Sequence, residues 1–173
     1  MDERPRTALG QLDASHRRHD QRLDALVAVA EQLCGGHGGP SDLEDLEDAV
    51  AWFARTVPRH FSDEDEAVFP ALAARRPDLA EPLAALSAEH PALLAAHRAV
   101  HDAVMAWAGH EPPAAELAGF LAAVRDVAAA YRDHAGREDV LLAGLELPPE
   151  DDERALAAMD ARRAPRAIAS DQM

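Results

Sequence analysis

The sequence predicts an all-α fold, an up-down-up-down antiparallel four-helix bundle with a short C-terminal tail helix. Of the 173 residues 48% are hydrophobic but only 4% are aromatic, and the hydrophobic share is mostly Ala and Leu, which favour helix over strand. Breaks rich in Gly and Pro divide the chain into long segments. Within these segments hydrophobic residues recur at spacings of three and four. Four long helices with short links imply antiparallel neighbours.

The first expected helix covers residues 7–34 and has the most regular pattern. Its hydrophobic seam alternates spacings of three and four over the whole length, which keeps the seam on one helix face. Two of the eight seam positions are histidine. The seam residues are Leu9, Leu12, His16, His19, Leu23, Leu26, Ala30 and Leu33.

Three more long helices and a short one are expected between the breaks. They cover residues 42–74, 83–108, 113–145 and 150–163. The breaks read GGHGGPS, RRPDLAEP, GHEPP and LPPEDD, which are sequences typical of turns. We therefore expect one helical bundle over residues 1–148, followed by residues 149–173 as a short tail helix and a frayed C-terminus.

Composition narrows the classes of function. The formal net charge is −15, from 17 basic and 32 acidic residues, and such a field repels nucleic acid and anionic membranes. The single cysteine, Cys34, cannot form a disulfide within the chain, which indicates a reducing compartment. The first residues lack the apolar stretch of a signal peptide, and no run approaches the roughly 18 apolar residues of a membrane span. We expect a cytoplasmic protein without nucleic-acid or membrane partners.

Two of the nine histidines stand four residues ahead of a glutamate within a helical segment. His60 precedes Glu64, and His134 precedes Glu138. This spacing places both side chains of each pair one turn apart on one helix face. Two such pairs facing each other suit two divalent or trivalent metal ions, because imidazole serves as a terminal ligand and a carboxylate can bridge with its two oxygens.

Four histidines, each on a different expected helix, lie at similar depth. His16, His60, His90 and His134 stand about 18 to 22 residues from the turn that joins each hairpin, so at about 1.5 Å per residue they share one level within a turn or so. His19 is one turn from His16 and remains an alternative on the first helix. Burying the glutamates at this level without a cation would cost several kcal/mol each.

Each of these features alone has a simpler interpretation. A lone histidine on an apolar face is more often a core residue with satisfied hydrogen bonds, and a His/Glu pair at this spacing arises by chance in an acidic helix. The combination of two pairs, four helices and one depth favours a metal site. His97 and His101, another pair at this spacing, are expected to line or flank the bundle. Cys34 is expected to act as a small buried hydrophobe, and Trp52, Phe53 and Trp107 to be core residues.

Three segments, HFSDEDEAVFP, AEHPALLAAH and DHAGREDVLL, resemble the hemerythrin-like domains, also called HHE cation-binding domains. The resemblance covers about residues 8–145. It implies a four-helix bundle with a non-haem di-iron centre, oxo- or hydroxo-bridged, in which glutamates bridge and histidines are terminal ligands. Carried over position by position, the resemblance assigns Glu64 and Glu138 as bridges and His60, His90 and His134 as terminal ligands, with His16 the best match on the first helix.

The sequence also departs from this pattern. Oxygen-carrying hemerythrins have a second histidine four residues after the one on the third helix, whereas here His90 is followed at that spacing by Leu94. This disfavours reversible oxygen carriage and implies an open coordination position, a water or hydroxide there, or a ligand from His19. Asp65 and Asp139 stand where the family has a second glutamate, and we expect them to be solvated or to support the ligands from behind.

The predicted function is therefore binding of two iron ions, coupled to binding or sensing of O₂, peroxide or NO, or to iron storage. A zinc or manganese binding module without a redox role is an alternative, because the ligand types permit these metals. A structural bundle acting as an interaction domain is another. Peroxide- or NO-linked redox activity is compatible with the ligand set, but the sequence predicts no catalytic residue outside that set.

Overall fold

The computed structural model describes residues 7–36, 38–108 and 110–163. Within these ranges every regular element is helical and no strand occurs, so the expected all-α class is confirmed for the described part. The expected fraying of the last ten residues lies outside the described residues. In chain order the elements are α1 (Ala8–Cys34), α2 (Pro40–Asp63), η1 (Glu64–Val68), α3 (Phe69–Arg75), η2 (Pro77–Leu79), α4 (Ala80–Ser87), α5 (His90–Ala106), α6 (Ala114–Leu142) and α7 (Pro149–Arg163).

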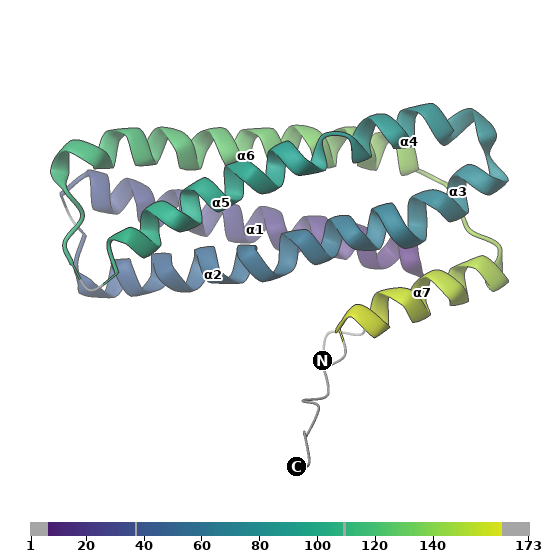
Figure 1. Ribbon diagram of the computed structural model, residues 1–173, viewed down its shortest axis with the longest axis horizontal. Helices are drawn as coiled ribbons and strands as arrows, with labels where there is room; N and C mark the ends of the chain where they lie inside the picture. The colour runs from purple at the N-terminus through teal and green to yellow at the C-terminus, as the bar shows by residue number, and fades with distance from the viewer. Residues whose placement is uncertain (1–6, 37, 109, 164–173) are drawn as a thin grey trace, which may run out of the picture.

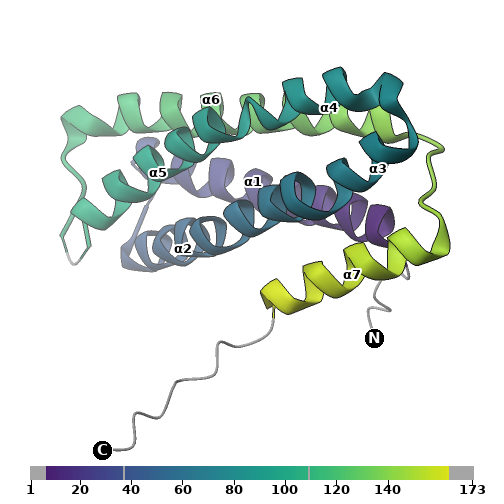
Figure 2. The ribbon, with the colours of Figure 1, turned by 45° about the vertical axis from the view of Figure 1, so that its right-hand side comes forward.

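The long helices α1, α2, α5 and α6 lie side by side along the long axis of the molecule (Figure 1). α1 packs against α2 and α6, and α5 packs against the same two helices. α3 and α4 extend the α2 and α5 columns at one end (Figures 1 and 2). This arrangement leaves an interior that faces all four long helices.

The first helix follows its predicted seam closely. Thr7 caps it, because its Oγ1 accepts a hydrogen bond from the backbone N–H of Gly10 at 3.1 Å. Gly36 follows its end with φ 71°, a conformation that glycine adopts without strain. Six of the eight seam residues are buried, and Leu9 and Leu33 at the two ends are partly buried.

The second expected helix, over 42–74, is continuous in direction but contains the π-helical element η1. Pro70 has no N–H for the carbonyl of Glu66, and in a regular helix its ring would clash with that carbonyl. The chain widens just before the proline, and the Phe69 N–H bonds to the carbonyl of Glu64, five residues back. A local widening at a proline has this physical cause in many helices.

The prediction of a single third helix over 83–108 is wrong. The chain forms α4 and α5 instead, with a turn at Ala88 and Glu89 between them. Pro91 is the second residue of α5, so it cannot donate to the carbonyl of Ser87 and a new helix begins there.

Two apolar clusters fill the interior, one towards each end. The larger lies between α1, α2, α5 and α6 and includes Phe53, Phe61 and Tyr131. The smaller joins the start of α1 and the α3–α4 region to α7 and includes Leu12 and Met159. Along α1, α2–η1 and α6, the buried histidines and glutamates stand between the residues of these two clusters.

The short helix α7 packs beside the start of α1 and the end of α2 (Figure 2). Its Ala155 and Met159 are buried in the smaller cluster, and Asp152 accepts a hydrogen bond from the backbone N–H of Ala8 at 2.8 Å. The short helix expected at 150–163 is therefore present. The domain boundary expected after residue 148 stays a prediction.

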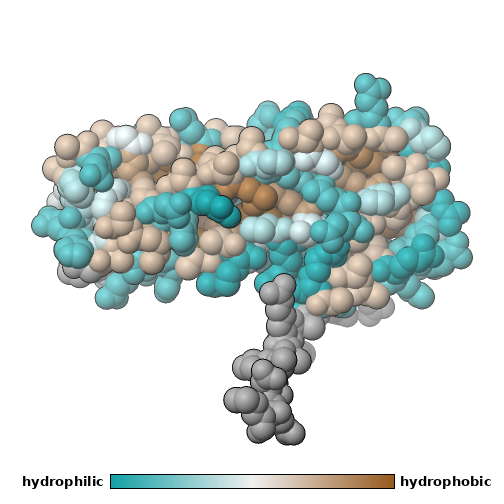
Figure 3. All heavy atoms as spheres, viewed as in Figure 1, coloured by the Kyte–Doolittle hydropathy of each residue, from teal (hydrophilic) through white to brown (hydrophobic). Residues whose placement is uncertain are grey.

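On the face shown in Figure 3, hydrophilic side chains are spread widely and the strongly hydrophobic atoms are visible only in small recessed areas. Within the ranges described above, no helix combines the length and the apolar character that crossing a membrane requires.

Candidate metal centre

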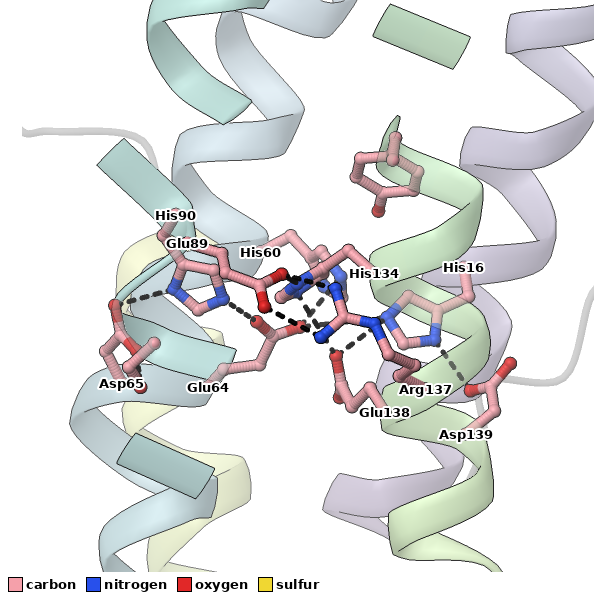
Figure 4. Close-up of polar contacts among 12 residues, drawn as sticks. His16, His60, Glu64, Asp65, Glu89, His90, His134, Arg137, Glu138 and Asp139 are labelled. Carbon is pink, nitrogen blue, oxygen red and sulfur yellow. Dashed lines mark hydrogen bonds and ion pairs between the residues drawn. The ribbon is translucent and has the colours of Figure 1, made fainter. Parts of the chain in front are cut away.

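Six of the seven residues predicted as ligands come together between the two apolar clusters (Figure 4). Glu64 and Glu138 lie between His90 on one side and His16 on the other. All six residues are between 0 and 5% exposed. The six residues are His16 from α1, His60 from α2, Glu64 from η1, His90 from α5, and His134 and Glu138 from α6.

The donor atoms fall into two groups that share Glu64. One consists of His16, His60, Glu64 and Glu138, the other of Glu64, His90 and His134, and within each group one donor atom per residue lies within 4.8 Å of the others.

The two oxygens of Glu64 face different histidines. Oε1 lies 2.8 Å from His60 Nε2, whereas Oε2 lies 3.1 Å from His90 Nε2. Glu138 is nearest to the first group, with Oε2 3.4 Å from His16 Nε2 and 4.0 Å from His134 Nε2. Glu64 thus has one oxygen toward each group, which is the position that a carboxylate needs in order to bridge two cations.

The inward-facing atoms have no hydrogen bond of good geometry among the described residues. They include Nε2 of all four histidines and both oxygens of Glu64 and Glu138. The short contacts between His60 or His90 and Glu64 bring the atoms close without the alignment of a hydrogen bond. Leaving so many buried polar atoms unpaired is costly. The donor set therefore fits metal cations, because imidazole nitrogens and carboxylate oxygens are both metal ligands.

Two of the imidazoles are held from behind by the aspartates that follow the bridging glutamates. His16 Nδ1 lies 2.8 Å from Asp139 Oδ1, and His90 Nδ1 lies 2.9 Å from Asp65 Oδ2. A carboxylate only accepts, so in the neutral imidazole Nδ1 carries the hydrogen and the lone pair of Nε2 is left for a cation. Each Glu-Asp dipeptide thus points one acid inward and uses the other to orient a histidine of a neighbouring helix.

The third support was not predicted from the sequence. His134 Nδ1 lies 3.0 Å from Oε2 of Glu89, at the turn before α5, and the guanidinium of Arg137 holds the same carboxylate with two hydrogen bonds of 2.7 and 2.6 Å. The available signal was the Glu89-His90 dipeptide, in which the acid directly precedes a predicted ligand.

Burial and mutual charge shift the ionisation of this group in opposite directions. Burial opposes the charged form of His16, but the nearby carboxylates of Glu138 and Glu64 outweigh it and raise the pKa of His16 to about 11. Burial also favours the neutral form of Glu64, yet the nearby imidazoles, first that of His60, hold its pKa well below the usual value. Burial and the charge of Glu64 raise the pKa of Glu138. In the metal-free protein a proton on His16 thus replaces part of the charge that cations would supply.

His19, the alternative on the first helix, is not brought into either donor group. Its Nδ1 lies 2.5 Å from the hydroxyl of Tyr131, and its ring packs edge-on against Trp52 and His60. Burial and then the nearby His60 lower its pKa to about 2, so it is a neutral side chain. Tyr131, the buried residue whose hydroxyl contacts Nδ1 of His19, was not predicted from the sequence.

The other residues singled out from the sequence lie away from the donor groups. Nδ1 of His97 bonds to the carbonyl of Leu93 at 2.9 Å, and Nδ1 of His101 lies 3.0 Å from Asp102. Cys34 is partly buried and donates to the carbonyl of Leu117. Phe53 and Trp107 are buried core residues as expected, and Trp52 is partly buried against the same cluster.

Buried imidazoles and carboxylates of this kind, inside a helical fold, are typical of proteins that bind metal cations. The chain belongs to the hemerythrin family, because residues 7–145 match the family model of the hemerythrin HHE cation binding domain. The resemblance found in the sequence is thereby confirmed. Comparison with curated proteins and with solved structures gives no match.

Proposed function

We propose that this protein binds two iron ions, bridged by Glu64 and Glu138, in a four-helix up-down-up-down bundle. His16 and His60 would hold one ion, and His90 and His134 the other. The observation that carries the proposal is the position of Glu64, whose two oxygens face histidines of different groups. The packing of α1, α2, α5 and α6 around this level supports the bundle.

When bound, two iron ions supply redox chemistry and an open coordination position for O₂, peroxide or NO. Four imidazoles and two carboxylates are too few donors for two octahedral ions. Leu94 stands where a further histidine would stand in an oxygen carrier, and it is packed against the larger apolar cluster. We therefore favour sensing or turnover of these small molecules over reversible oxygen carriage.

The chain's own residues perform three tasks in this proposal. The two apolar clusters keep bulk water from the donor atoms. Asp139, Asp65 and Glu89 accept hydrogen bonds from Nδ1 of three of the histidines, so that the neutral form of each imidazole has the lone pair on Nε2. Because the pKa of His16 is about 11 in the metal-free chain, its Nε2 would have to release a proton in order to hold a cation.

A zinc or manganese module without a redox role is the alternative that the donor set also supports, because imidazole and carboxylate suit those metals. The two proposals differ in colour. A ferric pair bridged by oxide absorbs in the near ultraviolet, whereas bound zinc does not absorb there.

The test is metal analysis with a near-ultraviolet spectrum on protein purified in air without added metal. We expect two irons per chain, and we expect exposure to peroxide or NO to change the spectrum. His60→Ala and Glu138→Ala should lower the iron content, whereas His101→Ala, a histidine outside the donor groups, should leave it at two. Full iron content in both ligand variants would show that the assigned ligands are wrong.

A further inference from the structure

A cavity of about 780 Å³ opens beside the donor groups. It lies between the start of α1, the end of α6 and the segment that leads into α7. Its lining includes His16 and Glu138, which are almost fully buried, together with Asp139. The cavity therefore reaches from the surface to two residues of the donor groups, while their inward-facing donor atoms stay buried.

Acidic side chains dominate the charge of this cavity. No Arg or Lys lines it among the described residues, and its five carboxylates are Asp13, Glu138, Asp139, Glu146 and Asp152. Three of them have a partner: Asp13 pairs with Arg17, Asp139 with His16, and Asp152 with the backbone N–H of Ala8. The rest of the wall is largely leucine. The electrostatic field of the carboxylates in the cavity favours the entry of cations.

Glu138 shows what kind of ligand the cavity leads to. Its side chain is 0% exposed, and both of its oxygens have no hydrogen-bond partner within the described part of the chain. Asp139, the next residue, is 53% exposed and contacts His16. The solvent-facing carboxylate of Asp139 thus directly follows the buried, unpaired carboxylate of Glu138. A hydrated cation could contact the exposed carboxylate first and lose its water as it moves to the buried one.

A second opening also reaches a residue of the donor groups, but basic side chains line it. It is much smaller, about 70 Å³, and is lined by His60 and His19. Three arginines, Arg18, Arg59 and Arg163, line the same opening. Their positive charge disfavours the approach of a divalent cation there.

We propose that the acidic cavity is the route by which divalent metal cations reach the centre. The inference rests on the proposed function in that it assumes a metal centre, and it adds the direction of loading. Six of the fifteen residues that line the cavity come from the segment after residue 142, among them Leu145, Leu147 and Asp152. The C-terminal part of the chain would therefore control how fast the centre fills.

The test is the rate of Co²⁺ uptake by metal-free protein, followed by the visible absorption of the bound ion at low ionic strength. Glu146→Lys should slow uptake about threefold to tenfold, and added salt should reduce this difference. Ala143→Trp, which narrows the cavity without a charge change, should slow uptake at all salt concentrations. The final Co²⁺ content should equal that of the unaltered protein in both variants.

The matched control is Glu111→Lys, which makes the same charge change between α5 and α6 and should load at the unaltered rate. Unchanged rates in both Glu146→Lys and Ala143→Trp, with normal final content, would overturn the loading route and leave the metal centre intact. Equal slowing in Glu111→Lys would reduce the effect to net charge and also overturn the route. An unaltered protein that takes up no Co²⁺ and holds no iron would instead overturn the proposed function.

Discussion

Glu89 and His134 are joined across two helices, with Oε2 of the glutamate 3.0 Å from Nδ1 of the imidazole. Because Arg137 keeps the carboxylate charged and in place, the hydrogen sits on Nδ1 and the lone pair of Nε2 faces the donor groups. The orientation of one proposed ligand thus depends on a residue that touches no cation.

Replacement of Glu89 should therefore weaken metal binding without removing a donor. We expect Glu89→Ala to lower the affinity about 10- to 100-fold, measured by competition with a chelator of known affinity. Asp133→Ala is the matched control, because Asp133 also pairs with Arg137 but its side chain is 73% exposed. No contact of Asp133 with a proposed ligand is part of this pairing. Equal affinity in Glu89→Ala and the unaltered protein would contradict the role assigned to Glu89.

The same residue predicts a dependence of stability on pH in the metal-free protein. Hydrogen bonds from Arg137, and then from His134, lower the pKa of Glu89 from 4.5 to about 2. A depressed pKa stabilises the fold above the unfolded value and loses this effect as the pH falls through the folded value. The difference in urea midpoint between the unaltered protein and Glu89→Ala should be constant from pH 7 to 5 and shrink from 4.5 towards 2. A difference at pH 3 as large as at pH 7 would refute this.

The ion pair between α7 and Asp63 should contribute measurably to stability. Asp63 is 0% exposed, precedes Glu64, and lies 2.5 Å from Arg163 and 3.2 Å from Arg162. We expect Arg163→Ala to lower the free energy of unfolding by about 1–3 kcal/mol, because a buried carboxylate loses one of its two partners. Arg154→Ala on the same helix is the control, since that side chain is 76% exposed and its pair is worth about 0–1 kcal/mol. Urea denaturation of both variants compares them directly.

His16 and His19 can be separated by one pair of variants. His16→Ala should lower the metal content, because Nε2 of His16 is one of the inward-facing donor atoms. His19→Ala should keep the metal content, since its Nδ1 faces Tyr131, but it should reduce stability by about 2–4 kcal/mol through the cavity it leaves. Metal analysis and thermal unfolding of the two variants decide the matter, and loss of metal from His19→Ala alone would reverse the assignment.

Much of the centre was predictable from the sequence because helical spacing is rigid. A His and a Glu four residues apart share a face wherever the helix stays regular, as His134 and Glu138 do in α6. The depth of four histidines followed from the rise per residue and from turns marked by Gly and Pro. The family motifs then narrowed which of His16 and His19 to favour.

What could not be predicted depends on contacts between distant residues or on local irregularity. The pairing of Glu89 with Arg137 joins residues 48 positions apart, and spacing along one helix carries no information about it. The position of α7 was equally hidden, because only Asp151, Ala155 and Met159 of that helix are buried. The expected helices over 42–74 and 83–108 ran straight through Pro70 and Pro91, and neither the widening at η1 nor the turn before α5 was predicted.

The π-helical turn at Glu64–Val68 has a practical consequence for engineering. Wide turns of this kind are rare and occur frequently at functional sites, so we expect substitutions or a deletion that restored the ordinary winding to exchange function for stability. The same changes would rotate Glu64 relative to the residues that follow it. Variants selected only for heat resistance should therefore bind metal less well, and a screen on this chain needs a measurement of metal content beside the heating step.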